Sequence, residues 1–334
     1  MFDLAQLEHP IVQAPMAGGP STPELAIAVS QAGGLGFLAA GYKRAENMRA
    51  EIAQVRANTE RPFGINVFVI PANAPDHAAV GTYLSELASE AQRLGVELGV
   101  PRWEDDDWQA KIELLCTQPP AVVSFAFGLP GQLVINKLHR AGSAVWVTVG
   151  NVAEAKLAAA EGVDALILQG TEAGGHRGGL RDDAGIGILA LTRLAAASVK
   201  LPLIAAGGIA DRQTLAAVQR AGAAAAQLGT AFMLAPEAAT NLVHRELIAG
   251  PAETGLTRAF TGRLARGIVN RFQAEHSATA PSAYPQIHHV TSPLRAAARA
   301  AGDPSAFNLW AGQAHQLAQA LPSAEIVRAI SARA

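Results

Sequence analysis

One glycine-rich segment contains the residue types best suited to chemistry. Residues 169–178 read Gln-Gly-Thr-Glu-Ala-Gly-Gly-His-Arg-Gly and follow the apolar run 165–168, which predicts a buried strand. The paired glycines Gly174 and Gly175 would let the backbone approach a flat or anionic ligand, because no Cβ intervenes. The imidazole of His176 could take or release a proton near neutral pH. Taken alone, such a segment is more typical of a tight turn with a solvent-facing histidine, so the rest of the chain must decide.

Short apolar runs that alternate with helical segments predict the elements that position this segment. The expected strands are residues 11–14, 35–40, 63–68, 121–125, 144–149, 165–168, 203–206 and 224–228. Each but the last is followed by a helical segment or a long connection, which is typical of an α/β protein of the (β/α)8 TIM-barrel class. A doubly wound open sheet is the alternative. It is disfavoured because the turn after the first strand lacks the Gly-x-Gly-x-x-Gly pattern of a dinucleotide fold.

The 334 residues are long enough for one barrel with an accessory part. Residues 1–233 are expected to form the barrel, with an insertion at about 71–120 that holds two helices. Residues 234–280 are expected to form a lid or substrate-binding segment, and residues 281–334 to form C-terminal helices that pack on the barrel. The acidic run 104–107 is explained by the dipole of the helix that follows it better than by a metal site.

Barrel enzymes keep their chemistry at the carboxyl ends of the strands. The residues at those ends are mostly neutral: Met16, Asn66, Gln169, Gly174, Gly175, His176, Gly207, Gly208, Gly229 and Thr230. The glycines after the last two strands can offer main-chain amides to a phosphate dianion, since barrels bind phosphate at those loops. For the buried polar Asn66, a ligand and a neighbouring backbone group are equally good partners. These mostly neutral residues can do little chemistry by themselves. A phosphorylated organic cofactor is therefore expected to supply the rest.

Several function classes are disfavoured by what the sequence lacks. A net charge of −2 gives no basic surface that would indicate nucleic-acid binding. Neither a signal peptide nor a membrane span is predicted, so we expect a cytoplasmic protein. No lysine falls at a strand's catalytic end, which disfavours a Schiff-base aldolase. No metal site is predicted, and the adjacent pair His288–His289 is expected at the surface, its rings on opposite faces if it lies in a strand. The late arginines Arg258, Arg263, Arg266 and Arg271 are expected to be solvated or paired with carboxylates.

The motifs together resemble the nitronate monooxygenase family, formerly called 2-nitropropane dioxygenases, whose members are FMN-dependent (β/α)8 barrels. The matching stretches are residues 13–19, 32–36, 63–68, 169–178, 206–209, 227–232, 257–263 and 309–313, and the C-terminal ones are similar to the bacterial nitronate-oxidising class. By this resemblance, His176 is the catalytic base or anion stabiliser. The resemblance assigns FMN binding to Met16, Asn66, Gln169, Gly174, Gly175, Gly207, Gly208, Gln227, Leu228, Gly229 and Thr230.

The resemblance implies oxidation of alkyl nitronates by FMN and O2 to a carbonyl compound and nitrite. Propionate 3-nitronate is the natural candidate substrate, and the role would be detoxification. The expected partners are this small molecule and O2, with no nucleic acid or membrane and with a homodimer left open. Two alternatives stay open: an NAD(P)H-dependent flavin reductase acting on quinones or enoyl thioesters, and a flavin-free phosphosugar isomerase or lyase on the same barrel.

Overall fold

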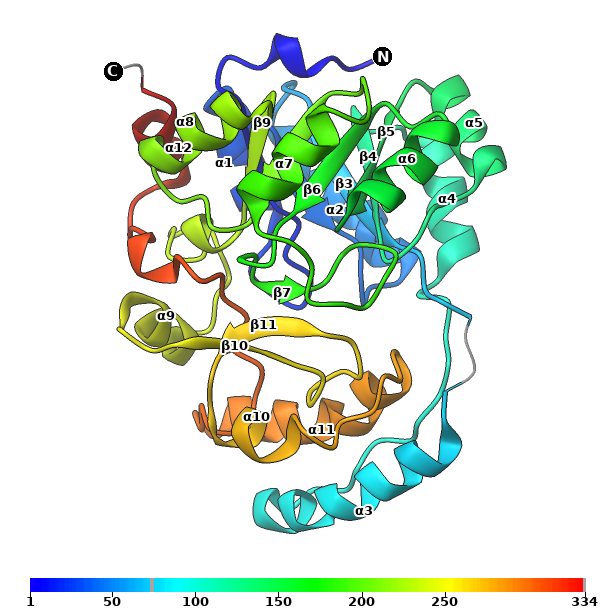
Figure 1. Ribbon diagram of the computed structural model, residues 1–334, viewed down its shortest axis with the longest axis vertical. Helices are drawn as coiled ribbons and strands as arrows, with labels where there is room; N and C mark the ends of the chain where they lie inside the picture. Colours follow the sequence, from blue (N-terminus) through cyan, green and yellow to red (C-terminus); the bar gives the residue numbers. More distant parts are fainter. Residues whose placement is uncertain (73–74, 333–334) are drawn as a thin grey trace.

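Eight parallel strands form the barrel in the computed structural model, which describes residues 1–72 and 75–332 (Figure 1). The barrel strands are β1 (Ile11–Gln13), β2 (Gly36–Ala39), β3 (Phe63–Phe68), β4 (Val122–Ala126), β5 (Ala144–Val149), β6 (Ala165–Gln169), β8 (Leu203–Ala206) and β9 (Ala225–Leu228). Their order is β1-β9-β8-β6-β5-β4-β3-β2, and a parallel bridge between Val12 and Leu35 joins β1 to β2. This bridge brings the two ends of the sheet together, which confirms the (β/α)8 barrel and excludes the open sheet.

Helices surround the barrel, and polar caps define where several of them begin. They are α1 (Pro23–Gln31), α2 (Ala45–Asn58), α4 (Trp108–Thr117), α5 (Gln132–Ala141), α6 (Val152–Ala160), α7 (Ile188–Ala196), α8 (Arg212–Ala221) and α12 (Ser323–Ser331). The hydroxyl of Thr22 accepts a hydrogen bond from the Leu25 amide ahead of α1, and Pro23 occupies the first turn. Asp211 and Thr214 form a capping box at the start of α8.

Alternation along the strands separates two apolar layers of the barrel. On β5, Val145 and Val147 pack in the layer shared with the helices, whereas Trp146 belongs to a second cluster with Phe37 and Ile167. Because successive side chains of a strand point to opposite faces, this second cluster fills the barrel interior. The chemistry is therefore confined to one end of a filled barrel.

A second unit, here named the cap, covers the carboxyl ends of the strands. It consists of α3 (His77–Leu94), β10 (Thr254–Thr257), β11 (Ala265–Ile268), α10 (Arg271–His276) and α11 (Gln286–Ala300). In Figure 1, β10 and β11 lie between the barrel and the helices α10 and α11. The cap has its own apolar cluster, which includes Tyr83, Phe260, Phe272 and Leu294. The remaining short elements of the described structure are η1 (Leu4–Gln6), β7 (Gly175–His176), η2 (Thr230–Phe232), α9 (Leu242–Ala249) and η3 (His315–Leu317).

The insertion holds the two expected helices, and they belong to different units. Helix α4 contacts α2 and α5 on the barrel, whereas α3 contacts α11 in the cap. At the C-terminal end, α12 contacts α1 and α8 of the barrel, whereas the main helix partner of α11 is α3. We keep the three-part division of the chain as a proposal, with α11 assigned by these contacts to the cap. None of the helices in the described part of the chain combines the length and apolar character needed to cross a membrane.

Candidate active site

A cavity of about 720 Å³ lies at the carboxyl ends of the barrel strands and extends to the cap. Its wall contains all but one of the predicted site residues: Met16, Asn66, Gln169, Gly174, Gly175, His176, Gly207, Gly208, Gln227, Gly229 and Thr230. Leu228 is the exception, because its side chain is buried in the core between the strands and the helices. His176 and the glycines of the last two barrel strands therefore share one cavity, although more than thirty residues separate them in the sequence.

The side chain of Gln169 folds the glycine-rich segment back over the end of β6. Its Nε2 donates to the carbonyl of His176 at 3.0 Å, and its Oε1 accepts from the amide of Gly178 at 2.7 Å. Arg177 donates to the carbonyl of Gly170 at 2.9 Å within the same loop. Glu172 accepts from the Ile188 amide at 3.0 Å, so it caps α7. Most polar groups of this segment hold its shape, and His176 is left for chemistry.

A two-residue strand places His176, and sequence patterns did not predict it. Residues Gly175–His176 form β7, which pairs antiparallel with β11 in a separate sheet of β10, β11 and β7. His176 lies opposite Ala265, and its Nε2 is 2.9 Å from the hydroxyl oxygen of Thr261. The turn interpretation is therefore wrong for this histidine, because it is tied to the cap at two points.

The environment of His176 favours its neutral form. Burial, with a further contribution from the guanidinium groups of Arg263, Arg295 and Arg177, lowers the pKa of His176 to about 3. The ring contacts the edge of Phe127, with centroids 5.9 Å apart, and lies 5.4 Å from the ring of Trp310. The imidazole is therefore neutral at pH 7, so one of its ring nitrogens is an acceptor, and a nearby anion would be needed to stabilise its protonated form.

Tyr42 and Phe127 reach the cavity wall from strained backbone positions. Their φ angles are 65° and 75°, in the left-handed region that non-glycine residues rarely adopt. The acidic run before α4 supports Tyr42, since Asp106 Oδ1 accepts from the Tyr42 amide at 2.9 Å. Asp106 also pairs at 2.8 Å with Lys111, which is fully buried. The helix dipole is therefore an incomplete explanation of the acidic run, which also anchors the cavity wall.

The strand-end residues fit a phosphorylated flavin. Gly207 and Gly208 have φ angles of 110° and 70°, so their backbone follows a course that side-chain-bearing residues disfavour. The buried Oε1 of Gln227 lines the cavity and has no hydrogen-bond partner among the residues that the structure describes. Such an acceptor suits an N–H group of a planar heterocycle, and glycine amides suit a phosphate. Asn66 donates to Ser124 at 2.9 Å, so a neighbouring residue already satisfies its amide in part.

The structure corrects the expected surface position of His288 and His289, and it corrects in part the expectation that the late arginines are solvated or paired with carboxylates. His288 and His289 lie on α11, not on a strand, and neither is at the surface: His288 lines the cavity with its ring stacked on Tyr42 at 4.3 Å. Of the late arginines, Arg258 pairs with Asp182 at 2.9 Å, as expected. Arg263 and Arg266 are instead buried and donate to backbone carbonyls.

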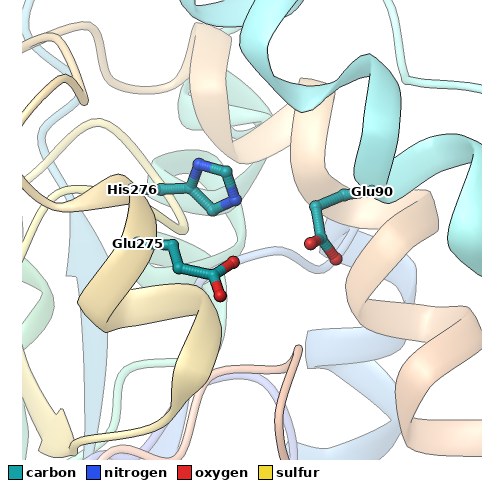
Figure 2. A group of neighbouring side chains, drawn as sticks. All are labelled: Glu90, Glu275 and His276. Carbon is teal, nitrogen blue, oxygen red and sulfur yellow. The ribbon is translucent and has the colours of Figure 1, made fainter.

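Arg271 belongs to an ion-pair cluster in the cap. Glu90, Glu275 and His276 of this cluster approach closely enough to suggest metal ligands (Figure 2). Arg271 binds both carboxylates, however, and Arg93 binds Glu90 at 3.1 Å. The carboxylates therefore already have cationic partners, and we assign the cluster to the stability of the cap.

Sequence reasoning missed the cavity residues that come from the cap. Arg295, Arg299 and Asn308 line the cavity, as do His244 of α9 and Trp310. The apolar periodicity of residues 286–300 could have indicated a helix, but no local pattern distinguishes a cationic side chain that faces a cavity from one that faces solvent. Their position depends on how the cap sits on the barrel.

Buried neutral histidines predict a loss of stability in acid. Burial lowers the pKa of His244 to about 4, whereas an unfolded histidine titrates near 6.5. Below about pH 6.5 the unfolded chain binds a proton that folded His244 refuses, so the free energy of unfolding should fall by about 1.4 kcal/mol per pH unit from this residue until pH approaches 4. Urea unfolding between pH 7 and 5 measures the slope. His244→Gln should make it shallower, whereas the control His77→Gln, at an exposed position, should not; equal slopes would contradict the assignment.

The barrel interior is filled with side chains, and the strand ends open into a cavity with a neutral imidazole on its wall. These features are those of an enzyme of the (β/α)8-barrel class. The profile of the nitronate monooxygenase family matches residues 1–332. The sequence is 42% identical to the nitronate monooxygenase of Paraburkholderia phytofirmans, covering 98% of this chain and 92% of that protein. Identity to the nitronate monooxygenase of Pseudomonas aeruginosa is 41%, covering 98% and 96%.

The same class is found among solved structures. The nitroalkane oxidase from Streptomyces ansochromogenes superposes with a TM-score of 0.95 at 49% identity, covering 98% of this chain and 96% of that one. The chain belongs to the nitronate monooxygenase family. It is therefore an oxidoreductase of a family that generally depends on a flavin, which confirms the expected class.

Proposed function

We propose that this chain uses FMN and O2 to oxidise alkyl nitronates to a carbonyl compound and nitrite. Propionate 3-nitronate is the proposed natural substrate, which would make the role detoxification. The observation that carries the proposal is that His176 lies on the wall of the cavity that also exposes the strand-end glycines and the unpartnered Oε1 of Gln227. Family membership supports the reaction class.

His176 would act as the base for neutral nitroalkanes and would orient a preformed nitronate. Thr261 has one hydroxyl hydrogen, and the carbonyl of Arg263 at 3.2 Å is positioned to accept it. The hydroxyl oxygen then accepts the Nε2–H of His176 at 2.9 Å. This arrangement leaves Nδ1 unprotonated, so Nδ1 would remove the α-proton of a nitroalkane.

The surroundings of His176 favour an anionic product of that proton transfer. The positive charges of Arg177 and Arg263, which contribute to the lowered pKa of His176, would also favour negative charge on the nitronate oxygens through their electric field. The rings of Phe127, Tyr284 and Trp310 border the imidazole and would exclude water from the reacting carbon.

Strand-end groups would hold the cofactor. Gly207, Gly208, Gly229 and Thr230 would bind the phosphate, while Gln227 and Met16 would contact the ring system. The chemistry supplied by bound FMN is acceptance of electrons from the substrate and their transfer to O2.

Nitrite release from propionate 3-nitronate in air tests the proposal directly. We expect a yellow protein that yields FMN on denaturation, consumes O2 and releases nitrite without a reductant. Anaerobic incubation with NADH is the control for the reductase alternative. Rapid bleaching by NADH without nitrite formation would favour that alternative, and a colourless protein that releases no FMN would favour the isomerase or lyase.

A further inference from the structure

A buried guanidinium without a counter-charge lies at the cap end of the cavity. Arg295 of α11 is 8% exposed, lines the cavity, and donates to the Thr291 hydroxyl at 3.0 Å and the His288 carbonyl at 2.8 Å. Its other partners are Asn308 Oδ1 and His288 Nδ1, at 3.4 and 3.3 Å. Within residues 1–72 and 75–332, no carboxylate pairs with it. A buried cation with only neutral partners is costly, which makes an anionic ligand favourable here.

Arg299 adds a second charge one helical turn further along α11. Its Nη2 donates to the same Asn308 Oδ1 at 3.4 Å, and its guanidinium lies 5.2 Å from the ring centre of Phe307. It too lines the cavity and has no carboxylate partner in the part of the chain that the structure describes. Like charges four residues apart on a helix repel each other, so an anion between them would relieve the repulsion as well.

His244 contributes a buried nitrogen to the wall of the same cavity. It is 7% exposed, and its Nε2 has no hydrogen-bond partner among the described residues. Arg299 and His244 line the same cavity. Two guanidinium groups and an imidazole that can donate through Nε2 form a donor-rich surface.

The late arginines either have a carboxylate partner or, like Arg263 and Arg266, donate to backbone carbonyls and do not line the cavity. Arg258 and Arg271 have carboxylate partners at 2.9 and 2.6 Å, and Arg263 donates to the carbonyls of Arg177 and Gly179. Arg295 and Arg299 therefore form a distinct pair on the cap side, whereas the proposed phosphate site is on the barrel side, after β8 and β9.

We propose that Arg295 and Arg299, assisted by His244, bind a carboxylate carried by the substrate and so select nitronates with a second anionic group. This inference rests on the proposed function, because it concerns the tail of the molecule whose nitronate end would meet His176. A planar carboxylate matches the guanidinium fork in shape as well as in charge.

The test compares two nitronates that differ in the tail, prepared from 3-nitropropionate and from 1-nitropropane. For Arg299→Gln we expect the ratio of kcat/KM for the carboxylated substrate to kcat/KM for the other to fall by about 10- to 100-fold, as for loss of a charge-assisted hydrogen bond. Arg299→Lys should retain part of the preference. Arg140→Gln, on the exposed face of α5, is the matched control and should leave the ratio unchanged. Circular dichroism establishes that the Arg299→Gln variant is folded, and an unaltered ratio in the folded variant would overturn the proposal.

A binding measurement separates this inference from the proposed reaction. Calorimetric titration of the holoenzyme with succinate, a dianion of similar length, should show weaker binding in Arg299→Gln by a similar factor. This titration can succeed even when neither nitronate yields nitrite, so failure of the reaction and failure of the subsite are distinguishable. Loss of FMN from Arg299→Gln would assign the guanidinium to the cofactor phosphate, and slower anaerobic reduction by NADPH in that variant would assign it to a nucleotide. Either result would overturn the proposal.

Discussion

Replacing His176 with asparagine should lower kcat for a neutral nitroalkane by about 10²- to 10⁴-fold, the usual contribution of a general base. Asparagine can still contact Thr261 but cannot accept the α-proton, so the loss should be much smaller with a preformed nitronate. FMN should stay bound, because the cofactor would be held by the strand-end groups. Steady-state nitrite release with both substrate forms measures the difference.

The matched control for this variant is His77→Asn, which replaces an exposed histidine at the start of α3. It should leave both rates unchanged. Undiminished turnover of the nitroalkane by His176→Asn would remove this residue from the mechanism. Equal losses with both substrate forms would show that His176 orients the anion and does not act as the base.

The same assignment predicts an unusual pH dependence for the unmodified protein. Because burial and three arginines lower the pKa of His176 to about 3, the free enzyme should keep its base unprotonated from pH 8 down to pH 5. For a neutral nitroalkane, kcat/KM should therefore show no acid limb near pH 6.5. An acid limb at that pH would contradict the lowered pKa of His176.

Replacing Gly207 with alanine should release the cofactor. A Cβ at this position would meet the backbone nitrogen and the Cβ of Ala173 at 2.8 Å, and the φ of 110° disfavours any side chain. The adjacent glycine-rich segment would have to move away from β8, and the proposed phosphate site would move with it. We expect FMN affinity to fall by at least about tenfold, equivalent to the ~1.4 kcal/mol scale of this strain.

Gly142 supplies the control, because it separates backbone strain from crowding. Its φ is 101°, but no atom lies within 4 Å of the position that a Cβ would take. Gly142→Ala should therefore lower the melting temperature modestly and retain FMN. Fluorescence titration with FMN and thermal unfolding of both variants make the comparison. Equal FMN affinity in Gly207→Ala and the unmodified protein would exclude this glycine from the cofactor site.

Predictions from local pattern succeeded where a short stretch carries its own signal. The strands Phe63–Phe68 and Ala144–Val149 were predicted with the bounds that the structure has. Helix caps and apolar runs depend on residues adjacent in the chain, so both can be recognised from the sequence alone. The rule that catalytic groups gather at the carboxyl ends of barrel strands then brought Asn66, His176 and Gly207 into one group before their distances were known.

The sequence by itself determined the barrel, the family and the glycine-lined wall of the cavity. Only the tertiary structure decided that His176 belongs to a strand paired with β11, and that α11 turns Arg295 and His288 toward the same cavity. The physical reason is the range of the interactions involved. Strand and helix propensities act over a few residues, whereas the pairing of His176 with Ala265 and the seating of the cap join segments about ninety or more positions apart, for which no local pattern exists.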